Sequence, residues 1–422
     1  MEKRLSTVQH TADTMSPGLR ATVERVWRPA PHRHDSASPI HVSLGAPPQG
    51  YRVVEEYVVV PHPRRAKFLV PIGSRAAAVS SLHRYSALKE GRERSARLAL
   101  AAAFRTGLGQ QVFRHRLMVS VDERLAASEY EKWLVLPHLA AELGEPDLFA
   151  GIVVGRRPGG KVKPTLQLFA PSGRPAGFAK LGWSPRTKGS VRTESAVLAS
   201  LGGRLGHLLV PSLLATGDWD ELVYSVTSPL PPSVRRWTKA PDTAPQATLD
   251  VARSVPLTHA PLAGSQYARR LRADITEVAG HEARVAGVLG EWLDRLELDL
   301  TVITFGRWHG DWVPWNLGRT DTRLVAWDWE YSATGVPVGY DVLHWHYQRS
   351  LFSGTLAEAV LEVDRAAQGL GSQGVALHAR PLVASLYLLE IFLRTAKNSV
   401  GRNWNPRIYP YLFELVSSRD RA

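Results

Sequence analysis

Three polar residues in the last third of the chain have the types and spacing that phosphoryl transfer requires. Asp311 lies five residues before Asn316, and Asp328 follows twelve residues after Asn316. Phosphoryl transfer needs a carboxylate that orients a hydroxyl nucleophile, and oxygen ligands that hold Mg²⁺ on a triphosphate. The apolar runs 301–305 and 323–327 predict short strands, so Asp311 and Asn316 should lie on a supported loop. The alternative for this loop is a surface turn, since Gly, Asp and Pro are common turn residues.

The motifs around these residues are similar to those of a known family. HGDWVPWN matches an HGDxxxxN loop, WDWEYS matches the counterpart of the kinase DFG segment, and GYDVLHW supplies a downstream Asp. The segment thus resembles the protein-kinase-like small-molecule phosphotransferases, which include aminoglycoside phosphotransferases and choline/ethanolamine kinases. The resemblance covers about residues 148–422. It implies that Asp311 is the catalytic residue, that Asn316 and Asp328 are metal ligands, and that Asp341 braces the loop from a helix start.

A kinase-like site also needs a strand lysine for the nucleotide phosphates and a helix glutamate that holds this lysine. Lys180 lies in the predicted strand 176–183, and Glu194 lies in the predicted helix 191–201. The alternatives are an exposed strand lysine and a solvated helix acid. Together with the downstream motifs, their order and spacing favour a Lys180–Glu194 pair.

The segment GRRPGGKVKP is the predicted nucleotide-contacting hairpin of such a site. Its glycines Gly155, Gly159 and Gly160 would allow the backbone to approach phosphates closely. The segment is neither a P-loop nor a GxGxxG motif, and an ordinary surface hairpin is the alternative.

We predict an α+β chain with a protein-kinase-like bilobal fold, in which a small antiparallel β-sheet lobe precedes a helical lobe. An extra N-terminal α/β region is expected before it, because the resemblance leaves the first third of the chain unexplained. The expected divisions are a flexible tail (1–45), an accessory region (46–145), an N-lobe (146–232) and a helical C-lobe (233–422). A proline cluster at 229–232 marks the expected connection between the lobes.

Composition restricts the class of protein. The 422 residues include 52 Lys and Arg against 39 Asp and Glu, giving a net charge of +13. Such a charge attracts phosphates, but the arginines are scattered, so we expect no nucleic-acid partner. No apolar stretch is long enough for a membrane span or a signal peptide, and there is no cysteine. We therefore expect a cytoplasmic protein, whose oligomeric state the sequence leaves open.

The expected function is an ATP-dependent, Mg²⁺-dependent transfer of the γ-phosphate to a hydroxyl of a small molecule. The acceptor is left open among amino alcohols, aminoglycosides and sugar-like molecules, as is GTP in place of ATP. Glu330 could contact metal or substrate, and the nearby Trp cluster could bind substrate or pack in the core, whereas His309 should pack within its loop. The alternatives are a catalytically inactive, nucleotide-binding regulatory protein and a basic binder of nucleic acid or membrane surfaces.

Overall fold

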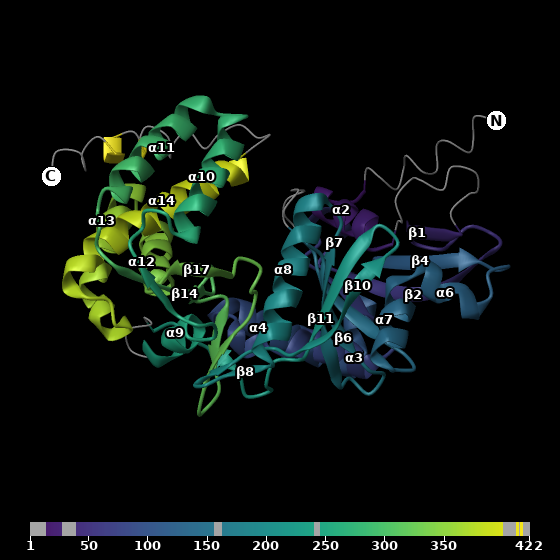
Figure 1. The fold of residues 1–422 in the computed structure, drawn as a ribbon. Coiled ribbons are helices and arrows are strands. Elements are labelled where there is room, and N and C mark those ends of the chain that lie inside the picture. The colour runs from purple at the N-terminus through teal and green to yellow at the C-terminus, as the bar shows by residue number, and fades with distance from the viewer. Residues whose placement is uncertain are drawn as a thin grey trace. The chain divides into compact units, whose positions relative to one another are not determined.

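The computed structural model describes residues 14–27, 39–155, 163–239, 245–399, 411–412 and 414–416. The chain forms two compact units. Unit 1 comprises Met1–Gly203 and Pro211–Arg236, and unit 2 comprises Arg204–Val210 and Trp237–Ala422. Helices and strands both contribute substantially (Figure 1), which confirms the predicted α+β class.

Unit 1 is built on one nine-stranded antiparallel sheet, whose strand order is β1-β4-β2-β3-β5-β6-β7-β11-β10. The strands are β1 (Ile40–Leu44), β2 (Tyr51–Val60), β3 (Phe68–Pro71), β4 (Arg116–Asp122), β5 (Phe149–Val153), β6 (Thr165–Phe169), β7 (Pro175–Gly182), β10 (Leu213–Trp219) and β11 (Leu222–Thr227). We expected an accessory region over 46–145 followed by an N-lobe over 146–232. Instead β3 pairs with β5, so both parts share this sheet and one compact unit.

The helices of unit 1 are α2 (Pro17–Val26), α3 (Arg75–His83), α4 (Gly91–Thr106), α5 (Leu108–Val112), α6 (Tyr130–Trp133), α7 (Val135–Leu143) and α8 (Pro185–Leu201). Helix α2 lies within the flexible tail predicted for 1–45, so the structure differs from that expectation over Pro17–Val26. Ser16 caps its first turn by accepting from the Leu19 N–H, and its residues Leu19, Val23 and Val26 are buried in the core. The burial of this apolar face stabilises a helix too short to be recognised from sequence periodicity.

Helix α8 starts earlier than the predicted Val191, and local capping explains the difference. Ser184 and Thr187 form a reciprocal capping box, and Pro185 occupies the first helical position, where its missing N–H costs nothing. The helix ends at Gly202, which adopts a left-handed conformation. Glu194 consequently lies in the third turn of a seventeen-residue helix, on its buried face.

Unit 2 is mainly helical. Its helices are α9 (Pro245–Ala252), α10 (Gln266–Ala279), α11 (Ala283–Glu297), α12 (Tyr340–Ser353), α13 (Leu356–Gln368) and α14 (Arg380–Ser399). Figure 1 shows α10 to α14 grouped together, and they share one hydrophobic core. Helix α14 runs through this core, since four consecutive residues, Leu386 to Leu389, are all fully buried. In the described part of the chain, no helix has the length and apolar character needed to cross a membrane.

Short strands carry the polar motifs of unit 2. Strand β14 (Ile303–Trp308) pairs with β13 (Thr258–Ala260) and β17 (Ala333–Pro337), whereas β15 (Leu317–Arg319) forms a hairpin with β16 (Leu324–Ala326). The strands predicted before Asp311 and before Asp328 are therefore confirmed as β14 and β16. Strand β9 (Leu208–Leu209) pairs parallel with β16 and antiparallel with β8 (Arg204–Leu205).

Candidate active site

The loop from His309 to Asn316 connects β14 to β15, and Gly310 determines its course. Gly310 has φ +83°, a conformation that L-residues with a side chain rarely adopt. A Cβ atom built there would lie 2.1 Å from the Tyr331 carbonyl oxygen. Two independent reasons therefore require glycine at position 310: the left-handed backbone conformation, and the lack of room for a Cβ atom. The loop packs tightly against the chain that follows β16.

Asp341, in the first turn of α12, holds this loop from the other side. Its two carboxylate oxygens accept the backbone N–H groups of His309 and Gly310, at 2.8 and 3.1 Å. Burial raises the pKa of Asp341 to about 7, while the two N–H donors partly oppose that shift. The bracing position that the resemblance implied for Asp341 is confirmed.

Asp311 lies among three polar groups that come from different elements. Its Oδ2 accepts from the Asn316 amide at 2.8 Å, and its Oδ1 lies 3.2 Å from His344 Nε2 and 3.9 Å from Arg394 Nη2. Burial alone would raise the pKa of Asp311. The His344 hydrogen bond and the positive charge of Arg394 outweigh burial and hold this pKa below its ordinary value. Asp311 is therefore an ionised carboxylate with positioned oxygens, as a proton acceptor for a hydroxyl must be.

His344 is fully buried, and its hydrogen bonds define its tautomer. Its Nδ1 lies 2.9 Å from the Tyr387 hydroxyl, while its Nε2 faces Asp311. Burial lowers the pKa of His344, so the ring is neutral. A neutral ring that accepts from Tyr387 at Nδ1 donates its single proton from Nε2 to Asp311.

His309 serves the structure of the loop, as the sequence predicted. Its Nδ1 accepts the backbone N–H of Asp311 at 3.2 Å, and its Nε2 lies 3.1 Å from the Trp327 carbonyl oxygen. Burial lowers the pKa of His309 to about 4 despite the nearby carboxylates. The imidazole is thus neutral and already engaged at both nitrogens.

The hairpin β15–β16 brings the two predicted metal ligands, Asn316 and Asp328, to the end of the hairpin opposite its turn. The Trp327 N–H donates to the Asn316 carbonyl oxygen at 3.1 Å, which places Asp328 next to the start of β15. Asp328 has φ +71°, a left-handed conformation that is uncommon for a residue with a side chain. Backbone outliers of this kind are concentrated at functional sites.

Asn316 and Asp328 suit Mg²⁺ because both present side-chain oxygens. The Asn316 Nδ2 donates to Asp311, at both its carboxylate and its carbonyl oxygen, so the Asn316 Oδ1 remains as an acceptor. An amide oxygen and a carboxylate are hard ligands of the kind that Mg²⁺ takes, usually together with phosphate oxygens and water. Within the described residues, no group of three or more Asp, Glu or His side chains could hold a metal ion.

In unit 1, the structure brings Lys180 and Glu194 together. Lys180 on β7 places its Nζ 2.8 and 2.7 Å from the two carboxylate oxygens of Glu194 on α8. The Glu194 side chain is 3% exposed, and that of Lys180 is 18% exposed. Lys180 and Glu194 therefore form a largely buried ion pair, and the alternatives of an exposed lysine and a solvated acid are wrong.

The predicted glycine hairpin is only partly within the described residues. Gly155 follows β5, and its carbonyl oxygen lies close to Gly18 of α2, where a Cβ atom would approach within 1.8 Å. Gly159 and Gly160 lie outside the described residues. A nucleotide contact from these glycines stays a prediction.

The tryptophans near the motifs mostly belong to the core. Trp308, Trp312, Trp329 and Trp345 are all at most 4% exposed, whereas Trp315 is 51% exposed. Core packing is therefore the role of these four, and Trp315 is the member of the cluster with the largest accessible face. Glu330 is half-buried.

Sequence reasoning missed two side chains that contact Asp311. His344 lies three residues after Asp341, so the GYDVLHW motif contained a signal for it: both residues lie on one face of α12. Arg394 comes from α14, more than 80 residues downstream of Asp311, and belongs to no short motif. Tertiary structure alone brings it to the loop.

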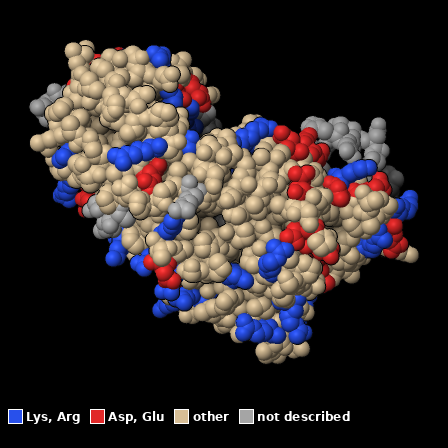
Figure 2. Space-filling model, turned by 60° about the horizontal axis from the view of Figure 1, so that its bottom comes forward, with Lys and Arg blue, Asp and Glu red and all other residues tan. Residues whose placement is uncertain are grey.

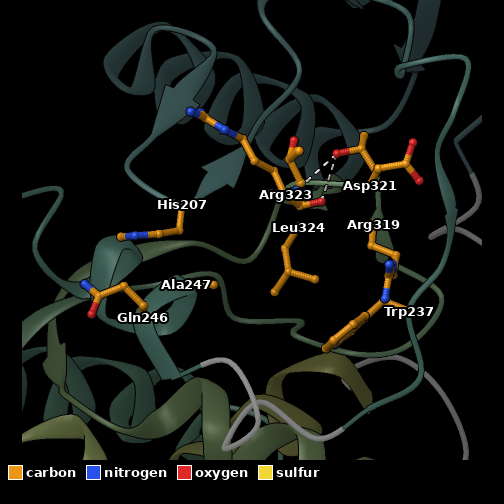
Figure 3. Close-up of a pocket in the computed structure, with 10 residues that line it drawn as sticks. His207, Trp237, Gln246, Ala247, Arg319, Asp321, Arg323 and Leu324 are labelled. Carbon is orange, nitrogen blue, oxygen red and sulfur yellow. Dashed lines mark hydrogen bonds between the residues drawn. The ribbon is translucent and has the colours of Figure 1, made fainter.

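Unit 2 also contains a pocket of about 290 Å³ (Figure 3). Its lining includes Trp237, Arg319, His207, Gln246 and Leu324. The pocket lies at the turn of the β15–β16 hairpin, whereas Asn316 and Asp328 flank the opposite end of that hairpin. It is consequently separate from the predicted metal ligands.

Charge on the face shown in Figure 2 is dispersed. Lys and Arg side chains form several separate groups there, with Asp and Glu side chains near some of them. The positive charge of the chain is thus not concentrated in one place on this face.

No family model and no curated protein sequence matches the chain, whereas solved structures of small-molecule kinases do. Choline kinase LicA from Streptococcus pneumoniae matches with 14% identity and a TM-score of 0.43, covering 67% of this chain and 98% of that one. A glucosamine kinase in complex with glucosamine, ADP and inorganic phosphate matches with 18% identity and a TM-score of 0.35, covering 93% and 96%. The gentamicin complex of APH(2")-IIa matches with 10% identity and a TM-score of 0.40, covering 70% and 95%.

These matches agree with the predicted resemblance to protein-kinase-like small-molecule kinases. Every identity is below 25% and every TM-score is below 0.5.

Proposed function

We propose that this chain is an ATP-dependent phosphotransferase that moves the γ-phosphoryl group to a hydroxyl of a small molecule. The observation that carries the proposal is the setting of Asp311. It is an ionised carboxylate in a braced loop, hydrogen-bonded to Asn316, whose free amide oxygen lies at the hairpin end that also bears Asp328. Catalysis of phosphoryl transfer consists mostly of such positioning and charge stabilisation.

In the proposed reaction, Asp311 orients the acceptor hydroxyl and takes its proton. The hydroxyl oxygen forms a bond to the γ-phosphorus while the bond to the bridging oxygen of ADP breaks. Asn316 and Asp328 would hold Mg²⁺, which supplies positive charge to the β- and γ-phosphates when bound.

Lys180 would hold the nucleotide phosphates, and Glu194 would keep Lys180 in place, as their close ion pair supports. We further propose that unit 1 is the β-rich lobe and unit 2 the helical lobe of a bilobal kinase-like fold. The absence of cysteine from the sequence supports a cytoplasmic location.

The test has two steps. First, nucleotide-dependent thermal shifts with Mg²⁺ establish whether ATP or GTP binds. Second, transfer from γ-labelled nucleotide is screened over amino alcohols, sugars and aminoglycosides. Asp311→Ala should abolish transfer while its ATP dissociation constant stays within about threefold of wild type, since removing a transition-state interaction spares ground-state binding. Asp328→Ala should instead weaken Mg²⁺-dependent ATP binding.

Glu291→Gln is the matched control, because Glu291 is exposed on helix α11 and should tolerate the loss of its charge. Wild-type turnover in Asp311→Ala would refute the proposal. ATP binding without transfer to any acceptor would favour a catalytically inactive, regulatory protein.

A further inference from the structure

Arg394 reaches the loop from His309 to Asn316 from a fixed position in the core of unit 2. It lies on α14, whose preceding residues Leu386 to Leu389 are fully buried, and its own side chain is only 20% exposed. The Arg394 side chain therefore starts from a fixed backbone position on a well-packed helix.

The Arg394 guanidinium contacts the loop in two ways. Its Nη1 donates to the Gly310 carbonyl oxygen at 2.5 Å, and its Nη2 lies 3.9 Å from Asp311 Oδ1. The guanidinium carbon also lies 4.0 Å from the centre of the Tyr331 ring, whose backbone carbonyl packs against Gly310. A planar, delocalised cation can make all three contacts, because stacking leaves its N–H groups free in the plane.

These contacts fix the peptide group between Gly310 and Asp311. The Gly310 carbonyl oxygen accepts from Arg394, and the Asp311 N–H donates to His309 Nδ1. The preceding peptide N–H, from Gly310, is held by Asp341. With successive peptide groups held by α12, α14 and the loop itself, the direction in which the Asp311 side chain leaves the backbone is determined.

We propose that Arg394 is a positioning residue, which orients Asp311 through the Gly310 carbonyl and steadies its carboxylate by charge. The inference rests on the proposed function, in which Asp311 acts on the acceptor hydroxyl. It predicts that loss of the guanidinium reduces turnover without weakening nucleotide binding. It also predicts that lysine is a poor substitute, since an ammonium group cannot stack on Tyr331 and reach both loop oxygens.

The experiment compares Arg394→Ala, Arg394→Lys and the control Lys397→Ala. Lys397 lies one turn further along α14, where it pairs with Asp274 and Glu277 and not with the loop. Turnover is measured as the hydrolysis of MgATP by water, so that no acceptor has to be known. Hydrogen exchange of the loop amides from His309 to Asn316 is followed in the same samples.

Arg394→Ala should lose turnover by on the order of 10²-fold, a loss that a small misplacement of a catalytic group can cause, with KM for ATP within about twofold of wild type. Arg394→Lys should stay closer to Arg394→Ala than to wild type. Added ethylguanidinium should restore turnover and loop protection several-fold in Arg394→Ala and leave Lys397→Ala unchanged.

Wild-type turnover in Arg394→Lys would overturn the inference. So would an experiment in which ethylguanidinium restores neither the turnover nor the loop protection of Arg394→Ala. Asp311→Ala is measured in parallel. If it hydrolyses MgATP like wild type, the proposed function fails; if it is inactive while Arg394→Ala is fully active, only the role of Arg394 fails.

Discussion

The imidazole of His309 joins the two halves of the candidate site, because its Nε2 lies within hydrogen-bond distance of the Trp327 carbonyl oxygen, at 3.1 Å. His309 begins the loop that carries Asp311, and Trp327 directly precedes Asp328. A single neutral side chain therefore ties the proposed proton acceptor, Asp311, and a proposed metal ligand, Asp328, to one framework. Protonation of this buried ring would break the arrangement, since Nδ1 could no longer accept from the Asp311 N–H.

This arrangement predicts a loss of stability in mild acid. The pKa of His309 is about 4 in the folded protein against an ordinary 6.5, so between these values the unfolded chain binds the proton more readily. Stability contributed by the neutral ring is present above pH 6.5 and is lost as the pH falls towards 4. Wild type should lose about 2 kcal/mol more between pH 7 and pH 5 than His309→Gln, which cannot titrate there. Urea unfolding followed by tryptophan fluorescence measures this, and an equal pH dependence of both proteins would contradict it.

Gly310→Ala should damage both the stability and the activity of the protein. The left-handed conformation alone costs a side chain about 1–2 kcal/mol, and the new Cβ would also collide with the Tyr331 carbonyl. Displacement of the loop should lower turnover by on the order of 10²-fold. Thermal unfolding and MgATP hydrolysis are the measurements. Gly287→Ala is the control, because Gly287 lies in helix α11 with open space around it, and there alanine should be neutral or stabilising. Wild-type behaviour of Gly310→Ala would show that the loop is not constrained as described.

The Lys180–Glu194 pair predicts that stability and nucleotide binding can be separated. Lys180→Met leaves the buried Glu194 carboxylate unpaired, which should cost about 3–5 kcal/mol of folding stability. The double variant Lys180→Met/Glu194→Gln removes both charges and should recover most of that loss. ATP affinity should stay weak in both, since neither has the ammonium group. Chemical denaturation measures the stability, and nucleotide titration measures the ATP affinity. Wild-type ATP affinity in the double variant would show that Lys180 does not bind the nucleotide.

Much of the candidate site could be predicted because its chemistry is local in sequence. Asp311 and Asn316 lie on one loop, and a single hairpin, β15–β16, separates Asn316 from Asp328. Lys180 and Glu194 likewise lie on consecutive elements, β7 and α8. In contrast, Arg394 contacts Asp311 only because α14 crosses the core, which no short segment encodes. Helix α2 was missed for a related reason: its ten residues form a helix because tertiary packing buries one of its faces.

The division between the two units has a consequence for how the protein can be dissected. Residues Arg204–Val210 belong to unit 2, although the chain on either side of them belongs to unit 1. Leu208 and Leu209 of this segment pair with β16, the strand that leads to Asp328. A fragment that begins at Trp237 would thus lack the neighbour of this strand and expose its free edge. Because unit 2 consists of two separate segments of the chain, cutting the chain at one position cannot yield the complete helical unit.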